Sequence, residues 1–297
     1  MRIRAGLILG LGVLSVGSAA IFFELADAPA LVKAAWRLCF ASAILAPLAL
    51  TRAKAELTSL SASDWRRAVI AGMALALHFG LWVPSLDYTS VASSVILVTT
   101  SPLFVGLLSP WWLKEVPSRG MMAGIALAFA GASWVVLGDG SAAGAEGLSL
   151  SGSAVFGDLL ALGGALAAAV YFMIGRQLRI GLSLLPYVFV VYSTAAICLV
   201  LTVLASGQPL FGYAPATWLV FLALAIIPQL LGHSSFNWAL QHISASLVSA
   251  AVLGEPIVSA ALAWALLAQR PSAAVLTGGS LILCGLALAS QSEAVVS

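Results

Sequence analysis

The sequence predicts an all-α integral membrane protein whose ten transmembrane helices form two inverted repeats of five helices each. Three observations predict this fold. The chain is 62% hydrophobic and 8% charged, whereas about a quarter of the residues in soluble domains are charged. Apolar runs long enough to cross a bilayer as a helix recur from end to end. The second half of the chain also repeats the first half.

The repeat is visible without a gap at an offset of 154 residues. At this offset Pro102, Gly124 and Gly131 align with Pro256, Gly278 and Gly285. Because five helices are an odd number, the second repeat must cross the membrane in the opposite sense to the first. Inverted repeats of this kind place a central site between the two halves. We expect residues 1–137 and 154–297 to form the repeats, joined by a flexible extracytoplasmic linker at 138–153 that is rich in Gly, Ser and Ala.

Each of the ten spans is close to the 20 residues that a helix needs to cross about 30 Å of hydrocarbon. The first span could also be read as a cleavable signal peptide. However, residues 6–25 align with residues 157–176 as the start of each half, so the repeat requires that span. The spans are expected at Ala5–Phe23, Ala30–Leu50, Ala68–Leu86, Val91–Leu113, Arg119–Leu137, Phe156–Gly175, Ser183–Ala205, Thr217–Leu240, Ala245–Leu267 and Ala273–Ala289.

The basic residues of the loops predict the orientation, because cytoplasmic loops carry an excess of Lys and Arg. If both termini lie in the cytoplasm, Arg270 is the only basic loop residue on the opposite side of the membrane. We therefore predict cytoplasmic N- and C-termini. The residues on the cytoplasmic side are then Arg2, Arg4, Arg52, Lys54, Arg66, Arg67, Lys114, Arg119, Arg176 and Arg179.

Glu255 lies near the middle of the ninth span, where a charged side chain costs roughly 2.5 kcal/mol or more on insertion scales. We interpret it as a substrate or proton site. The alternative is a structural carboxylate that bonds a neighbouring helix or stays protonated in apolar surroundings. Pro256 follows it, aligned with Pro102, and each proline removes one backbone amide from its helix. Both prolines are predicted hinges, and simple kinks are the alternative.

Lys33 and Arg37 share one face of the second span. Arg37 lies roughly 12 Å along that span, counted from Pro29 at 1.5 Å per residue. Lys33 can extend to the membrane surface, but Arg37 is too deep to do so easily. Arg37 is therefore a candidate counter-charge for Glu255 or for an anionic substrate group. A purely structural ion pair is the alternative.

Two groups of polar side chains are predicted to face a central cavity. His78 and Trp82 lie four residues apart in the third span. His233 and Asn237, with Gln229, recur at the same spacing in the eighth span. Histidines that face a neighbouring helix are also common as hydrogen-bonded core residues, so a structural role is the alternative. Among the remaining aromatic residues, Trp36, Trp238, Tyr171 and Tyr192 are further cavity candidates, whereas tryptophans near helix ends fit the interfacial belt.

The sequence contains no pattern typical of an enzyme or of a cofactor or metal site. We therefore expect no enzymatic activity, no cofactor and no bound metal. The basic residues form no patch of the kind that binds nucleic acid. Cys39, Cys198 and Cys284 lie within apolar runs, which favours buried thiols. The glycines of the fifth and tenth spans are typical close-packing positions, and we expect any homodimer to form through these two helices.

The sequence resembles the drug/metabolite transporter superfamily, specifically its bacterial EamA-type permeases, over nearly the whole chain. The resemblance rests on AAWRLCFAS around Arg37, LDYTSVASSVILVTTSPLF and LKEVPSRGMMAGIALAFAG in the first half, and GDLLALGGALAAAVYFMIGR and FNWALQHISASLVSAAVLGEPIVSAALAWALL in the second. It implies a 5+5 fold with a central cavity, and matches Arg37, Glu255 and Pro256 to family positions. Glu115 matches an acidic residue that follows the fourth helix, whereas the second repeat has Gln269 and Arg270 there.

Members of this family typically export amino acids or other small metabolites across a bacterial inner membrane. The resemblance therefore implies a multipass exporter of small metabolites that works by alternating access. One alternative is an importer or exchanger of an anionic metabolite such as a sugar phosphate, with Lys33 and Arg37 as the anion-binding cations. The other is a membrane accessory protein that transports nothing.

Overall fold

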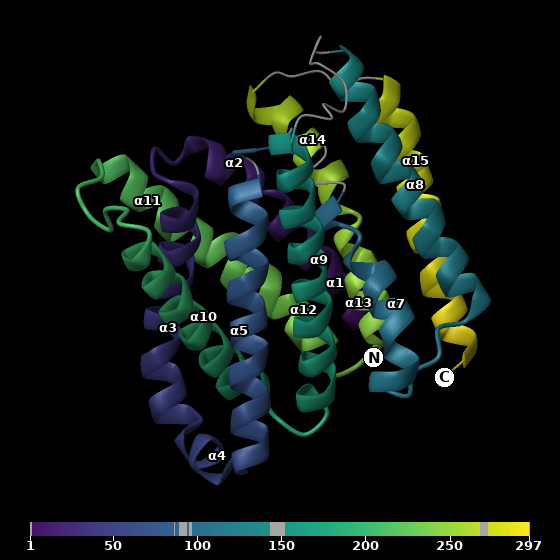
Figure 1. The fold of residues 1–297 in the computed structure, drawn as a ribbon. Coiled ribbons are helices and arrows are strands. Elements are labelled where there is room, and N and C mark those ends of the chain that lie inside the picture. The colour runs from purple at the N-terminus through teal and green to yellow at the C-terminus, as the bar shows by residue number, and fades with distance from the viewer. Residues whose placement is uncertain are drawn as a thin grey trace.

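The computed structural model of the chain describes residues 2–85, 87–88, 94, 97–142, 152–267 and 273–296. Every regular element in this part of the chain is a helix (Figure 1). The elements are α1 (Arg2–Gly17), α2 (Ala19–Leu25), α3 (Ala30–Arg52), α4 (Lys54–Ser59), α5 (Ala62–Ser85), α7 (Ser101–Trp112), α8 (Arg119–Ala142), α9 (Gly152–Arg179), α10 (Leu184–Ala205), α11 (Pro215–Leu224), the π-helix η1 (Ala225–His233), α12 (Ser234–Ala239), α13 (Ala245–Val252), α14 (Glu255–Leu267) and α15 (Ala273–Val296).

Six helical stretches of the described chain are long and apolar enough to cross a membrane. This finding agrees with the predicted class of membrane protein. Three further apolar helical stretches are shorter, so the count of ten spans and their 5+5 arrangement stay predictions. The six long stretches are Arg4–Phe23, Ala30–Arg52, Ala62–Ser85, Val155–Arg179, Leu184–Ala205 and Pro215–Ala239.

Helices from the two halves of the sequence interleave in the centre of the bundle. Helix α5 of the first half packs along α9 of the second, and α3 packs along α10. Their buried apolar side chains, with those of α1 and α11–α13, form one continuous core. We call the end of the bundle that carries α4 and the segments 113–118 and 240–244 the α4 end, and the end that carries α2 the α2 end (Figure 1).

Helices α8 and α15 form a pair at the edge of the bundle (Figure 1). Their glycines bring the two backbones into direct contact. A Cβ atom added at Gly124 would lie 2.5 Å from the carbonyl oxygen of Gly285, and one at Gly131 would lie 2.6 Å from that of Gly278. The glycine faces are therefore used within one chain, and a homodimer through these helices stays a prediction.

Two predicted boundaries differ from the structure. Helix α8 continues past Leu137 to Ala142, and α9 begins at Gly152, so both helices extend into the predicted linker. The rest of that linker, residues 143–151, lies outside the described residues. The first part of the predicted fourth span, residues 91–93 and 95–96, also lies outside them, as do Gln269 and Arg270.

We predict that Gly124→Ala lowers the free energy of unfolding by about 1–3 kcal/mol, because its methyl group has no room against the α15 backbone. Gly10→Ala is the matched control, since a Cβ at Gly10 meets nothing within 4 Å and alanine favours a helix by roughly 0.5–1 kcal/mol over glycine. Thermal unfolding of the purified variants measures both effects. Equal stability of the two variants would contradict the close approach of α8 and α15.

Candidate functional site

A small cavity lies in the centre of the bundle, between helices of both halves. Its volume is about 40 Å³, which holds no more than a few water molecules. The cavity is therefore narrow in this structure. Its lining is aromatic and apolar with a few polar groups: Val16, Ala19, Arg37, His78, Phe79, Trp82, Val98, Thr99, Ser101, Ala168, Tyr171, Phe172, His233, Phe236, Val252 and Glu255.

Helix α3 places the guanidinium group of Arg37 in this cavity. The side chain is only 1% exposed. Its Nε donates to Gln229 Oε1 at 2.8 Å, and its Cζ lies 4.6 Å from the ring centroid of Phe79, which is within the range of a cation–π contact. Its Nη2 has no hydrogen-bond partner among the described residues. Because a buried donor without an acceptor is costly, this nitrogen suits an acceptor inside the cavity.

Glu255 reaches the cavity from a break in the ninth predicted span. Helix α13 ends at Val252 and α14 begins at Glu255. Between them the chain makes a tighter turn, in which the amides of Leu253 and Gly254 donate hydrogen bonds to carbonyls three residues earlier. The predicted single helix Ala245–Leu267 is therefore two helices. The carboxylate lies at the N-terminus of α14, where the helix dipole favours a negative charge. Glu255 and Arg37 line the same cavity without forming an ion pair with each other.

The aligned position of the first half is broken in the same way. A turn at Thr99 and Thr100 precedes α7, and the amide of Thr100 bonds the carbonyl of Leu97 at 3.2 Å. Pro102 lies in the first turn of α7, and Pro256 is the second residue of α14. Proline is well tolerated there because the first amides of a helix have no partner within it. Both prolines thus mark a restart of the helix, not a kink inside a continuous one.

His78 and Trp82 lie together on α5, as their spacing predicts. Their rings are stacked, with centroids 5.8 Å apart and an interplanar angle of 18°. His78 Nδ1 lies 3.0 Å from the carbonyl oxygen of Gly164 on α9, which fixes the ring across the interface between the halves. Trp82 Nε1 has no hydrogen-bond partner among the described residues. This indole therefore offers a second donor beside the cavity.

The predicted stripe Gln229, His233 and Asn237 does not form one wall. Gln229 bonds Arg37, and His233 lines the cavity with an unpartnered Nδ1. Asn237 does not line it, because its Nδ2 donates to Tyr171 Oη at 2.5 Å and to Tyr192 Oη at 3.3 Å. The helix changes from π to α winding at Ser234. Asn237 positions Tyr171, which does line the cavity.

The other aromatic candidates have other partners. Trp36 donates to the carbonyl of Leu210 at 2.9 Å and packs against Trp218 near the α2 end. Trp238 packs on His242 at the α4 end. Phe79, Phe172 and Phe236 also line the cavity, although no sequence pattern pointed to them. An apolar aromatic residue in a membrane span looks the same in the sequence whether or not it lines a cavity.

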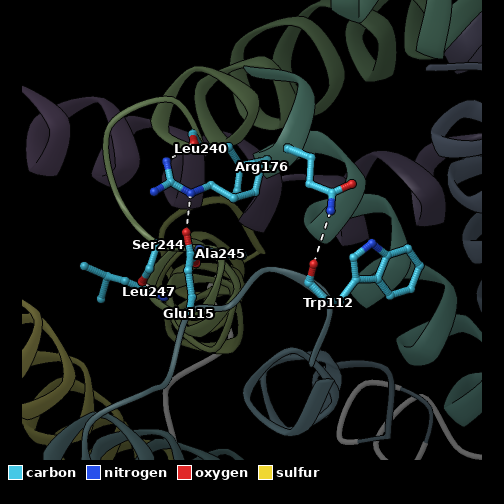
Figure 2. Close-up of polar contacts among 8 residues, drawn as sticks. Trp112, Glu115, Arg176, Leu240, Ser244, Ala245 and Leu247 are labelled. Carbon is cyan, nitrogen blue, oxygen red and sulfur yellow. Dashed lines mark hydrogen bonds and ion pairs between the residues drawn. The ribbon is translucent and has the colours of Figure 1, made fainter. Parts of the chain in front are cut away.

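At the α4 end, Glu115 ties the two halves together (Figure 2). Lys114 has a φ of 59°, in the left-handed region, and this turn ends α7 and directs Glu115 to the second half. Glu115 Oε1 accepts from Arg176 Nε at 2.6 Å, and Oε2 accepts from the amide of Ala245 at 3.4 Å. Arg176 Nη1 also donates to the carbonyl of Leu240 at 2.8 Å. One carboxylate therefore joins the end of α7 to α9 and to the start of α13.

Arg179 is buried, although the sequence places it among the basic residues of the cytoplasmic loops. It is 1% exposed. Its Nε donates to the carbonyl of Asn237 at 2.9 Å, Nη1 to the carbonyl of Leu182, and Nη2 to Gln241 Oε1 at 2.9 Å. This guanidinium satisfies carbonyls at the ends of α9 and α12. Hydropathy alone does not distinguish such a buried cation from one exposed in a loop.

The chain matches one known protein family in both of its halves. The model of the EamA-like transporter family matches residues 4–137 and again residues 155–291. The chain belongs to the EamA-like transporter family. The resemblance drawn from the sequence motifs is thereby confirmed, and the protein is a membrane-embedded, multipass transporter.

Two individual proteins are similar to this EamA-like chain. An uncharacterized transporter of Archaeoglobus fulgidus (strain ATCC 49558 / DSM 4304 / JCM 9628 / NBRC 100126 / VC-16) is 26% identical over 246 residues, which cover 81% of each chain. A crystal structure of another protein superposes over 100% of both chains with a TM-score of 0.82 and 20% sequence identity. The latter likeness shows that the fold has been observed experimentally.

We predict that Tyr171→Phe lowers the free energy of unfolding by about 1–3 kcal/mol, because it removes the acceptor of the buried Asn237 amide. Tyr187→Phe is the matched control. Tyr187 is equally buried, but its hydroxyl has no hydrogen-bond partner among the described residues, so its removal is expected to leave stability unchanged. Thermal unfolding in detergent compares them, and a larger loss for Tyr187→Phe would contradict the described network.

Proposed function

We propose that this protein exports small metabolites that carry a carboxylate, such as amino acids or related compounds, from the bacterial cytoplasm by alternating access. The proposal includes ten spans in a 5+5 arrangement in the inner membrane, with the α4 end and both termini in the cytoplasm. The basic loop residues support this orientation. The export direction is supported by the resemblance to bacterial permeases described above.

The observation that carries the proposal is the set of polar atoms around the central cavity. Arg37 Nη2, Trp82 Nε1 and His233 Nδ1 have no partners within the described structure, and all three residues line the cavity. The first two atoms are hydrogen-bond donors, which a carboxylate can accept. Glu255 lines the same cavity and offers an acceptor for an ammonium group. A zwitterionic amino acid satisfies both sides.

Alternating access requires the cavity to open to one side at a time. The cavity volume of about 40 Å³ is below the 300 Å³ or more of typical ligand pockets, so in the proposed mechanism the cavity must widen before it holds a substrate. The breaks before Pro102 and before Pro256 adjoin this cavity. A few residues at helix ends can absorb the backbone change of such a motion. These two positions are the hinges in the proposed mechanism.

The import of a sugar phosphate is less well supported. A phosphate monoester carries up to two negative charges near neutral pH, and phosphate sites use several cations or bidentate arginines. Lys33, the second cation of that alternative, donates to the carbonyl of Phe23 at 2.7 Å and is not among the residues that line the cavity. Arg37 is the only arginine or lysine among the described lining residues.

We predict that Glu255→Gln and Arg37→Gln each reduce flux through proteoliposomes at least about tenfold, as expected when a buried charge pairing with a substrate is lost. A melting-temperature screen of the purified protein against amino acids, nucleosides and sugar phosphates selects the transported probe, because a ligand that binds the folded state raises the melting temperature.

Asp64→Asn is the matched control. It makes the same kind of change at an exposed carboxylate that bonds Ser61 near the α4 end, and we expect normal flux. Unchanged flux and unchanged pH dependence in Glu255→Gln would remove Glu255 from the mechanism. Flux measured separately in inside-out and right-side-out vesicles tests the export direction, and equal rates in the two would contradict it.

A further inference from the structure

A second, larger cavity opens at the α4 end of the bundle. Its volume is about 410 Å³, within the usual range for small-molecule sites. It lies between the segment that follows α7 in the first half and α9 and α13 in the second. Its lining is mostly polar: Lys114, Glu115, Val116, Pro117, Ser118, Met121, Arg176, His242, Ile243, Ser244, Ser246 and Ser292. We call it the vestibule.

The vestibule already holds one carboxylate, that of Glu115 (Figure 2). This carboxylate bonds Arg176 Nε and, at 3.4 Å, the first amide of α13. The two side chains remain 20% and 25% exposed for Arg176 and Glu115 respectively, so water reaches the pair. Ion pairs that water reaches are weak. A carboxylate from solution can therefore compete with Glu115 for Arg176.

Ser246 provides an independent sign of a ligand. It lies in the first turn of α13, is 2% exposed, and its hydroxyl has no hydrogen-bond partner within the described part of the chain. The same side chain lines the vestibule. The first turn of a helix also carries a partial positive charge. A hydroxyl without a partner in the first turn of a helix, in a cavity that Arg176 also lines, is suited to an anionic oxygen.

The charge around the vestibule is positive. Burial lowers the pKa of His242, which lines it, and the positive charges of Arg179, Arg4 and Arg176 lower it further. The imidazole is therefore neutral near pH 7, and the cations around it favour an anion in the vestibule. Lys114 adds a further cation to the lining.

The alignment of the two repeats does not repeat this pair of charges. In the alignment of the repeats, Glu115 corresponds to Gln269 and Arg176 to Leu25. The positions aligned with the ion pair therefore carry neither an acid nor a base. If the Glu115–Arg176 ion pair served only to close one end of the bundle, and the other end closed in the same way, the second repeat would be expected to carry a matching pair of charges.

We propose that the vestibule is an access site for solutes with a carboxylate group, and that the solute's carboxylate replaces that of Glu115 on Arg176 and so releases the tie between the two halves. The inference rests on the proposed function for the direction in which the solute then moves. Binding and release at this end do not depend on it.

Binding is tested with benzoate as the probe and uncharged benzamide as its matched control, measured by saturation-transfer NMR on the purified full-length protein. We expect Glu115→Gln to bind benzoate about tenfold more tightly than the wild type, because the competing carboxylate is gone. Adding Ser246→Ala or Arg176→Gln to Glu115→Gln should reverse this gain, whereas adding Arg66→Gln, which removes an exposed positive charge outside both cavities, should not. Benzamide should bind none of the variants.

Equal benzoate affinity in the wild type and Glu115→Gln would overturn the proposal, as would loss of the gain when Arg66→Gln is added to Glu115→Gln. The Ser246→Ala variant keeps the test valid if Arg176→Gln does not fold, because it removes only one hydroxyl oxygen. None of these measurements requires transport. A protein that binds benzoate in this way but moves no solute would refute the proposed function and leave the vestibule site standing.

Release of the tie is tested by thiol labelling of Val98→Cys, which lines the central cavity, in a chain without Cys39, Cys198 and Cys284. A membrane-impermeant maleimide is applied to inside-out vesicles. We expect labelling to be about tenfold faster with Glu115→Gln, as for a shift of the open population by one order of magnitude. The exchange of charges in Glu115→Arg with Arg176→Glu should restore the slow rate.

Benzoate should also accelerate labelling of Val98→Cys when Glu115 is present, and should have no further effect in Glu115→Gln. Gln177→Ala is the control, because it removes a neighbouring bond between the halves, that to the Trp112 carbonyl, without changing a charge. Equal labelling rates in all variants would overturn the role of Glu115 as a tie.

Discussion

A guanidinium group enclosed by an apolar helix bundle is the constraint on which the rest of this structure depends. Arginine stays charged in proteins, so Arg37 must be surrounded by groups that compensate for the loss of water. Its partners come from both halves of the chain: Phe79 in the first and Gln229 in the second. The halves are therefore held together at the cavity. The polar lining atoms that have no hydrogen-bond partner then determine which solutes the cavity can bind.

The irregular backbone lies beside the same cavity. In a membrane, backbone groups without a helical partner are tolerated only where they are buried in protein or face a polar cavity. The turn at Thr99 and Thr100 and the break before Glu255 both fall there. The break also places Glu255 at a helix N-terminus, which lowers the cost of its charge. The break before Glu255 thus lowers the cost of the buried carboxylate and also places the backbone groups that lack helical partners beside the cavity.

The two ends of the bundle are chemically different, although the repeats are related. At the α4 end, Glu115, Arg176 and Arg179 satisfy carbonyls and amides of the second half. At the α2 end, among the described residues, Trp36 packs on Trp218 and donates to the carbonyl of Leu210. Ionic contacts at the water-exposed end can be exchanged for solute contacts, whereas aromatic packing has no such competitor.

The sequence by itself determined the class of protein, the duplication, and the two charged residues, Arg37 and Glu255, that lie deep in apolar spans. It could do so because the cost of placing a charge in hydrocarbon depends on the span alone and is visible in hydropathy. Only the tertiary structure decided that Asn237 lies behind Tyr171, that the span around Glu255 is two helices, and that Arg179 is buried. Those outcomes depend on which side chain a neighbouring helix presents, and partners such as Glu115 and Arg176, which lie far apart in the sequence, leave no signal in a single local pattern.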